Sequence, residues 1–457
     1  MSRLKAAALL LALGSTPAFA HSAARGFVLL LPTGYVFAGG ALAVLASFAL
    51  VSEMDGKSFG RRTDDHPPAS AASGLPSLVS AALLAFLIFI GFAGSHDPTE
   101  NLLPLAIWTL WWVVLVLLHP LFGNLWSALN PFIGIYALMN RILGGRLEPP
   151  CLRLPQGFSY YPALAIFAAF AWFQLIDPGP QDPPRLALAV TLYVAFTMLA
   201  VMGFGPSDWL ARGDPFAIFL AQLGAAAPFG RKRLVLPGAG LLSLAPLPIA
   251  GMLFVLLTLS SISFDGFANT FLWLSITGVN PLDFPGRTEV MTANTLGLAG
   301  AFIVLTAVFV AAVTTGWLWA GRPGQLKPLL GRLVLSLVPI SIVYHFAHYL
   351  SGTLLSTQYL VLALNDPFGT GANIFGLDGL HTTASFQNTA TGALALFSTQ
   401  TISVIAGHAV SVAVAHAMAI ETGLSRAKVF RLEAPLAVFM VLYTAFGLWL
   451  LATPAIS

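Results

Sequence analysis

Only 9% of the 457 residues are charged, whereas a soluble domain carries roughly 25%. Hydrophobic residues make up 57% of the chain, and the net charge is +3. So few charges cannot cover a water-exposed surface, which excludes a soluble protein, and the apolar content excludes a disordered chain. We expect no nucleic acid partner, because no basic patch with interleaved aromatic residues is present. The single cysteine, Cys151, excludes an intramolecular disulfide and multi-cysteine metal sites.

The N-terminus has the three parts of a secretory signal peptide. A positive start and an apolar stretch precede the small-residue cleavage site Ala18-Phe19-Ala20. We expect residues 1–20 to be removed, so that the mature chain begins at His21. Residues 21–457 then form a single helical domain in a bacterial inner membrane. The alternative is an uncleaved first membrane anchor.

Ten stretches without Asp, Glu, Lys or Arg follow one another along the chain. They are 26–52, 66–96, 101–140, 154–176, 186–207, 234–264, 290–321, 333–365, 379–420 and 434–457. Each contains an apolar segment near the roughly 20 residues that a helix needs to cross hydrocarbon. The pattern predicts an all-α polytopic membrane protein with about ten transmembrane helices.

The loops between these stretches alternate in charge. Basic loops hold Lys57, Arg61 and Arg62; Arg141, Arg146 and Arg153; Arg231, Lys232 and Arg233; Arg322, Lys327 and Arg332; and Arg426, Lys428 and Arg431. The other loops hold Asp97 and Glu100; Asp177 and Asp182; Asp265 and Asp283; and Asp366 and Asp378. Because cytoplasmic loops are rich in Lys and Arg, one orientation fits every loop, with both termini outside.

Two segments, 125–140 and 208–224, are expected not to cross; they either lie at the surface or re-enter the membrane. Both belong to an internal parallel repeat that covers residues 102–176 and 186–261. Its clearest marks are Asn130-Pro131-Phe132 and Asp214-Pro215-Phe216, which lie 84 residues apart. Transporters often carry their sites at broken helices between repeats. The alternative is an old duplication kept for packing.

Histidines are concentrated in the eighth and ninth predicted spans. His345 and His348 lie three residues apart and share one helix face, and His408 lies at a similar predicted depth. Three imidazoles with an open position form a hydrolytic metal site that activates water. This reading predicts zinc or copper on His345, His348 and His408, with His21 as a further ligand.

Two acids on the predicted outer side complete this hypothesis. Asp265 and Asp366 are candidate catalytic residues, as ligands or as partners that orient the histidines. Two alternatives stay open for the histidines. One histidine from each span would suffice to ligate a haem, or all of them hydrogen-bond across helices and only fasten the bundle; for His119 and His416, each considered alone, this structural role is favoured.

Several short segments occur in a fixed order along the chain. They are Arg212-Gly213-Asp214-Pro215-Phe216, Phe264-Asp265-Gly266, Ala347-His348-Tyr349, Asp366-Pro367-Phe368-Gly369-Thr370-Gly371-Ala372, Gly407-His408 and Ala415-His416. Together they resemble a family of bacterial polytopic membrane proteins named fenitrothion hydrolases. The resemblance implies hydrolysis of an aryl phosphotriester bond.

The leading hypothesis is therefore a membrane hydrolase that acts on a small lipophilic, phosphotriester-like molecule with the help of a histidine-bound metal. A small-solute transporter built on the repeat is the first alternative. A haem- or copper-binding protein of a respiratory system is the second.

Overall fold

The computed structural model describes residues 33–53, 74–229, 234–280, 286–377 and 379–453, and every regular element in these ranges is helical. The predicted signal segment 1–20 and His21 lie outside the described residues. Up to residue 225 the α-helices are α2 (Thr33–Ser52), α3 (Leu75–Ala93), α4 (Leu102–Leu105), α5 (Val116–Phe122), α6 (Trp126–Leu129), α7 (Pro131–Ile142), α8 (Tyr161–Leu175), α9 (Pro183–Phe204), α10 (Pro206–Arg212) and α11 (Pro215–Ala225).

The remaining α-helices include the longest ones. They are α12 (Ile249–Ala268), α13 (Phe271–Thr277), α14 (Arg287–Trp319), α15 (Leu326–Leu333), α16 (Val338–Asn365), α17 (Ala390–Ile420) and α18 (Arg426–Ala452). Short elements of other types are the π-helix η2 (Ala106–Leu115) and the 3-10 helices η3 (Gln156–Phe158), η4 (Ala239–Ser243) and η6 (Val334–Leu337).

Nine helical stretches within the described ranges are long and apolar enough to cross a membrane. They fall in nine of the ten predicted stretches, so a polytopic α-helical membrane protein is confirmed. The remaining predicted stretch, 154–176, contains α8, whose 15 residues extend roughly 22 Å. The longest stretch, Leu326–Asn365, joins α15, η6 and α16 into one continuous helical path.

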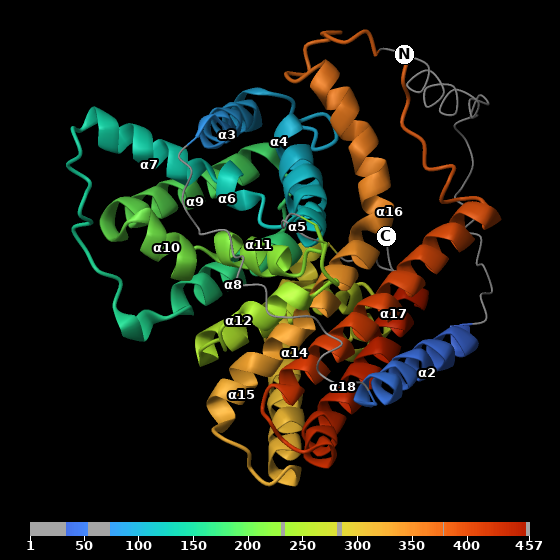
Figure 1. Ribbon diagram of the computed structural model, residues 1–457. Helices are drawn as coiled ribbons and strands as arrows, with labels where there is room; N and C mark the ends of the chain where they lie inside the picture. Colours follow the sequence, from blue (N-terminus) through green and yellow to red (C-terminus); the bar gives the residue numbers. More distant parts are fainter. Residues whose placement is uncertain (1–32, 54–73, 230–233, 281–285, 378, 454–457) are drawn as a thin grey trace.

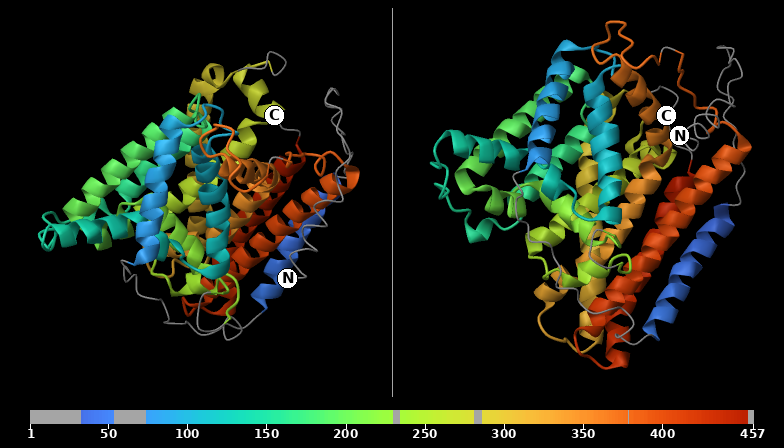
Figure 2. Two further views of the ribbon diagram at one scale, coloured as in Figure 1. Left: turned by 90° about the horizontal axis from the view of Figure 1, so that it is seen from above. Right: turned by 45° about the horizontal axis from the view of Figure 1, so that its top comes forward.

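Helix α12 occupies the centre of the bundle. Of its apolar window 78% is buried inside the protein, compared with 22% of that of α14. It packs against α8, α14 and α16, whereas α2 lies at the edge of the molecule beside α17 and α18 (Figures 1 and 2). Polar side chains on α12 therefore face other helices rather than lipid.

The two predicted non-crossing segments are pairs of short helices, and both pairs follow the same order of elements. A glycine with positive φ, Gly123 or Gly205, ends the long helix before each pair. Asn130 and Asp214 then cap α7 and α11, and each side chain accepts the backbone N–H two residues later. Proline at the first helical position follows both caps, which favours a helix start there.

The surroundings of these two helices differ. α11 is buried along nearly its whole length and packs against α5, α8 and α16. α7 lies at the edge of the molecule, against α3 and α9 (Figure 1). At roughly 17 Å each, neither helix is long enough to cross hydrocarbon alone.

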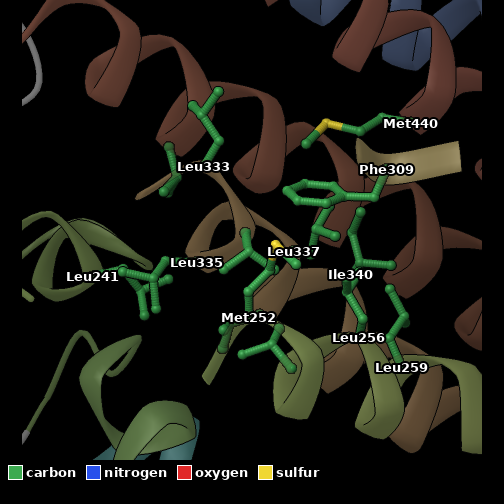
Figure 3. Close-up of a cluster of buried hydrophobic side chains, with 14 of the residues drawn as sticks. Leu241, Met252, Leu256, Leu259, Phe309, Leu333, Leu335, Leu337, Ile340 and Met440 are labelled. Atoms are coloured by element: carbon green, nitrogen blue, oxygen red, sulfur yellow. The ribbon is translucent and has the colours of Figure 1, made fainter. Parts of the chain in front are cut away.

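A dense apolar cluster fills the middle of the bundle (Figure 3). Leu333, Leu335 and Leu337 contribute to it from the path that leads into α16, and Leu256 and Leu259 contribute from α12. All five side chains are fully buried. Along α15, η6 and α16, these leucines separate Arg332 on one side from His345 and His348 on the other. Any polar site at one end of the bundle is thus separated from the other end by tightly packed hydrocarbon.

Candidate functional site

A carboxylate–histidine pair joins α12 to α16. The Nε2 atom of His348 lies 2.8 Å from Oδ2 of Asp265. The side chains are 28% and 18% exposed, respectively, so this pair is only partly buried inside the protein. Asp265 stands near the C-terminus of α12, a position that the sequence assigned to an outer loop.

Two further polar side chains complete a network around Asp265. The Tyr349 hydroxyl donates to Oδ2 of Asp265 at 3.1 Å, and Nε2 of Gln174 donates to the Tyr349 hydroxyl at 2.6 Å. Gln174 comes from α8, so three helices share one hydrogen-bonded chain. With two donors on one carboxylate oxygen, the position of the Asp265 carboxylate is fixed.

The hydrogen bond to Asp265 also determines how the His348 ring is used. An ionised carboxylate only accepts, so Nε2 carries a hydrogen, and in the neutral ring Nδ1 then holds the lone pair. Beside Nδ1 the chain has Gly266: a Cβ there would lie 3.9 Å from Nδ1 and 3.4 Å from Cδ1 of Leu450. The missing side chain of this glycine therefore leaves room for a group of methyl size near Nδ1.

His345 is turned away from this pair. Its Nε2–H donates to the backbone carbonyl of Trp112 in the π-helix η2, at 2.7 Å, and its ring contacts those of Trp112 and Tyr349. Beside it lies a cavity of about 20 Å³, enough for roughly one water molecule. Its polar lining comes from Gln174, Thr258, Ser261, Ser341, His345 and Tyr349.

Charged groups lie near Gln174, at the end of α8. Arg287, at the start of α14, donates to the backbone carbonyls of Gln174 and Asp177, at 3.2 and 3.0 Å. Asp177 in turn accepts two hydrogen bonds of 2.7 Å from Arg185. Burial raises the pKa of the Asp177 carboxyl, but the Arg185 guanidinium and the Gly179 N–H outweigh it, so the pKa is lowered overall.

The structure does not bring the three histidines of the predicted metal site together. His408 donates from Nδ1 to the carbonyl of Val404 in its own helix, at 2.8 Å. Its ring contacts the rings of Tyr344 and Tyr443. In the described parts of the chain, no three His, Cys, Asp or Glu side chains come together as metal ligands. Residues three apart differ by about 60° around a helix, enough to turn His345 and His348 toward different neighbours.

Among the described residues, these three histidines do not converge as the ligands of a zinc site would, and the predicted zinc or copper stays a prediction. The haem alternative, with one axial histidine from α16 and one from α17, stays a prediction; His345 and His408 contact different aromatic residues. His21, the proposed further ligand, lies outside the described residues.

Asp366 does not join the network, contrary to the prediction. It follows α16 directly and stands 18 residues from His348, which corresponds to about 27 Å along a helix. Its carboxylate accepts the backbone N–H groups of Thr370 and Gly371, at 3.0 and 2.6 Å. Burial raises its pKa, but these N–H groups lower it overall. Asp366 thus organises its own loop.

Two other histidines have structural partners. Nδ1 of His119 donates to the carbonyl of Leu115, and its Nε2 accepts the N–H of Trp126, so both ring nitrogens are used. Nδ1 of His416 lies 3.0 and 2.9 Å from the two carboxylate oxygens of Glu433. Both side chains of this second carboxylate–histidine pair are 3% exposed.

Sequence reasoning missed Tyr349, Gln174 and Glu433 as partners in these networks. Tyr349 directly follows His348, and Gln174 is the single amide in the apolar sequence of α8; both were visible signals. Glu433 was placed in a basic loop because the charge-free stretch begins one residue later, whereas α18 already begins at Arg426.

Comparisons of the chain with protein-family models, with curated proteins and with solved structures gave no match.

Proposed function

We propose that this membrane-embedded protein hydrolyses lipophilic, phosphotriester-like molecules and that Asp265 and His348 together act as its general base. The observation that carries the proposal is the 2.8 Å bond between these two partly exposed side chains. A carboxylate that holds a histidine in one tautomer is a recurrent way to make a base for water or hydroxyl groups.

In this reaction Nδ1 of His348 removes a proton from a water molecule while the water oxygen attacks phosphorus. The phosphorus–oxygen bond to the aryl group breaks, the aryl oxide leaves with the electron pair, and the imidazolium later returns its proton to water. Asp265 stabilises the positive charge on the ring, as in other acid–histidine pairs. Tyr349 and Gln174 keep the carboxylate oriented.

The test uses fenitrothion with the purified full-length protein and records release of the coloured nitrophenolate. We expect His348→Ala and Asp265→Asn each to lower the rate by roughly 10²- to 10⁴-fold, the usual contribution of a positioned base. His96→Ala, which changes an exposed histidine in a loop, is the matched control and should keep the rate. Equal rates in all four proteins would refute the proposed base.

A transporter is the second candidate, favoured by the central position of α11. This short helix begins at the buried cap Asp214 and follows a break at Gly213, and transporters place binding sites at such broken helices. Proteoliposomes loaded with a pH-sensitive dye distinguish the two functions. Solute-dependent proton movement without fenitrothion hydrolysis would favour transport.

We also propose ten crossings in a bacterial inner membrane, with α8 as the short one, both termini outside, and residues 125–140 and 208–224 not crossing. The alternating loop charges support this topology. A reporter fused after Arg233 should lie in the cytoplasm and one at Gly379 outside, and N-terminal sequencing should begin at His21. Two reporters on the same side would contradict the topology.

A further inference from the structure

A second polar region lies on the other side of the apolar cluster from Asp265 and His348. It is a cavity of about 620 Å³, within the usual size of small-molecule sites. Three segments line it: 243–246, which runs from the last residue of η4 toward α12, parts of 323–332 around α15, and parts of 418–422 at the end of α17. We call this cavity the α15 vestibule.

A buried arginine forms one wall of the α15 vestibule. Arg332 is only 8% exposed, and its guanidinium donates to the carbonyls of Leu242 and Leu244, at 2.6 and 2.5 Å. Its Nη2 also donates to Oε2 of Glu421 at 2.6 Å. The backbone carbonyls fix the position of the guanidinium, but they carry no net charge. The carboxylate of Glu421 therefore balances the positive charge of Arg332.

Glu421 is the more adaptable partner in this ion pair. Its side chain is 34% exposed, compared with 10% for Arg332, and it stands at the C-terminus of α17. A glutamate in that position can turn toward water without disturbing the contacts between Arg332 and the backbone. An anion from solution can then take its place on Nη2.

The balance of charge around the α15 vestibule favours an anion. Arg332 and Glu421 are the two charged residues of its lining, so the lining carries one positive charge once Glu421 turns away, and Arg322 and Lys327 lie close to it in the sequence. A concave site with an excess of one charge attracts ligands of the opposite charge. Leu244, Leu329, Met418 and three prolines add apolar walls, which suit the organic part of such a ligand.

We propose that the α15 vestibule binds a small organic anion whose carboxylate or phosphate group pairs with Arg332 in place of Glu421. The site is separate from the Asp265–His348 pair, because leucines of the apolar cluster (Figure 3) lie between the two along the path α15–η6–α16 and along α12. Planar guanidinium groups are well suited to carboxylate and phosphate oxygens. The anion is either a soluble molecule or the headgroup of an anionic lipid, and these share the same chemistry at Arg332.

The binding test uses inorganic phosphate as the probe and the full-length protein in neutral detergent. Phosphate should raise the unfolding temperature more than sodium chloride of equal ionic strength does. Glu421→Gln removes the competing charge but keeps a side chain of the same shape. We expect it to lower the Kd for phosphate by about tenfold, as for coupled sites in general.

Glu53→Gln is the matched control, because Glu53 forms an exposed ion pair with Arg426 elsewhere in the protein. It should leave the Kd for phosphate unchanged. A second arm compares vesicles of phosphatidylglycerol with vesicles of phosphatidylcholine. Stabilisation by phosphatidylglycerol alone assigns the site to a lipid headgroup, and stabilisation by free phosphate assigns it to a soluble anion.

Two results would overturn the proposal. One is that neither phosphate nor phosphatidylglycerol stabilises the protein beyond its control, in wild type and in Glu421→Gln alike. The other is that Glu53→Gln changes the Kd as much as Glu421→Gln does, which would make the effect one of overall charge.

Discussion

The bundle contains the same chemical pair twice, in two different settings. Asp265 and His348 are 18% and 28% exposed. Tyr349 donates to Asp265, and Gln174 on a third helix donates to Tyr349. Glu433 and His416 are each 3% exposed and connect α18 to α17. Both pairs have separations close to 2.9 Å, so distance alone does not distinguish them.

What distinguishes the pairs is access. An imidazole can act as a base only where water or a substrate can reach its free nitrogen, and the His348 side chain is 28% exposed, compared with 3% for His416. A fully buried pair has a different consequence: removing one member leaves the other buried without its partner. We therefore assign chemistry to the first pair and helix association to the second.

The largest expected effect on stability comes from breaking the buried pair. Glu433→Ala should lower the free energy of unfolding by about 3 kcal/mol, because it leaves His416 buried without its carboxylate. The activity of the protein that still folds should be unchanged. Asp265→Asn should show the reverse pattern, with low activity and nearly normal stability.

Thermal unfolding in detergent and fenitrothion turnover, both normalised to folded protein, measure these two effects. Replacing the pair together, as Glu433→Leu with His416→Phe, should recover most of the stability, since no polar group is then left alone. Loss of turnover in the double variant would show that the buried pair also takes part in the chemistry, and the comparison would fail.

A smaller effect should follow from filling the space beside His348. Gly266→Ala introduces no clash, since the nearest side-chain atoms are 3.4 and 3.9 Å from the new Cβ, and alanine favours a helix. Stability should be kept, whereas turnover should fall by about tenfold because reacting groups are sensitive to displacements near 1 Å. Gly300→Ala in α14, where a Cβ meets nothing within 4 Å, should change neither quantity.

A third carboxylate, Asp177, pairs with an arginine instead of a histidine, and its contribution to stability should depend on pH. Asp177 has a lowered pKa in the folded protein, so the stability from its bonds to Arg185 is present above the usual aspartate range and is lost as the pH falls below that range, through the lowered pKa of the folded state. Wild type should unfold at a higher temperature than Asp177→Asn at pH 7. The difference should shrink toward pH 3; a difference that is constant with pH would show that the charge of Asp177 has no role.

The sequence predicted the spans well because hydrocarbon thickness imposes both a length and an absence of charge. It also located the breaks before α7 and α11, since Asn130 and Asp214 precede proline and cap the next helix. Burial was harder to predict: the two segments have similar patterns, yet α11 is central and α7 peripheral.

The candidate site was predicted only in part. His348 and Asp265 were both singled out, and they do meet. The rotation of each helix about its axis decides which neighbours a side chain faces, and periodicity within one helix does not determine it. His345 was grouped with His348 by helical spacing, His408 by predicted depth and Asp366 by loop position, and each has another partner.

The smallest expected effect concerns His408, whose Nδ1 donates to a backbone carbonyl of its own helix. It is 0% exposed, and its Nε2 atom is buried without a hydrogen-bond partner in the described part of the protein. Replacing an unsatisfied buried group by an apolar one of similar shape is often nearly neutral. His408→Phe should therefore change the free energy of unfolding by less than about 1 kcal/mol and leave turnover intact. A metal or haem ligand would behave differently, because its loss would abolish the bound group, so metal analysis and an absorption spectrum of His408→Phe beside wild type decide between the two roles.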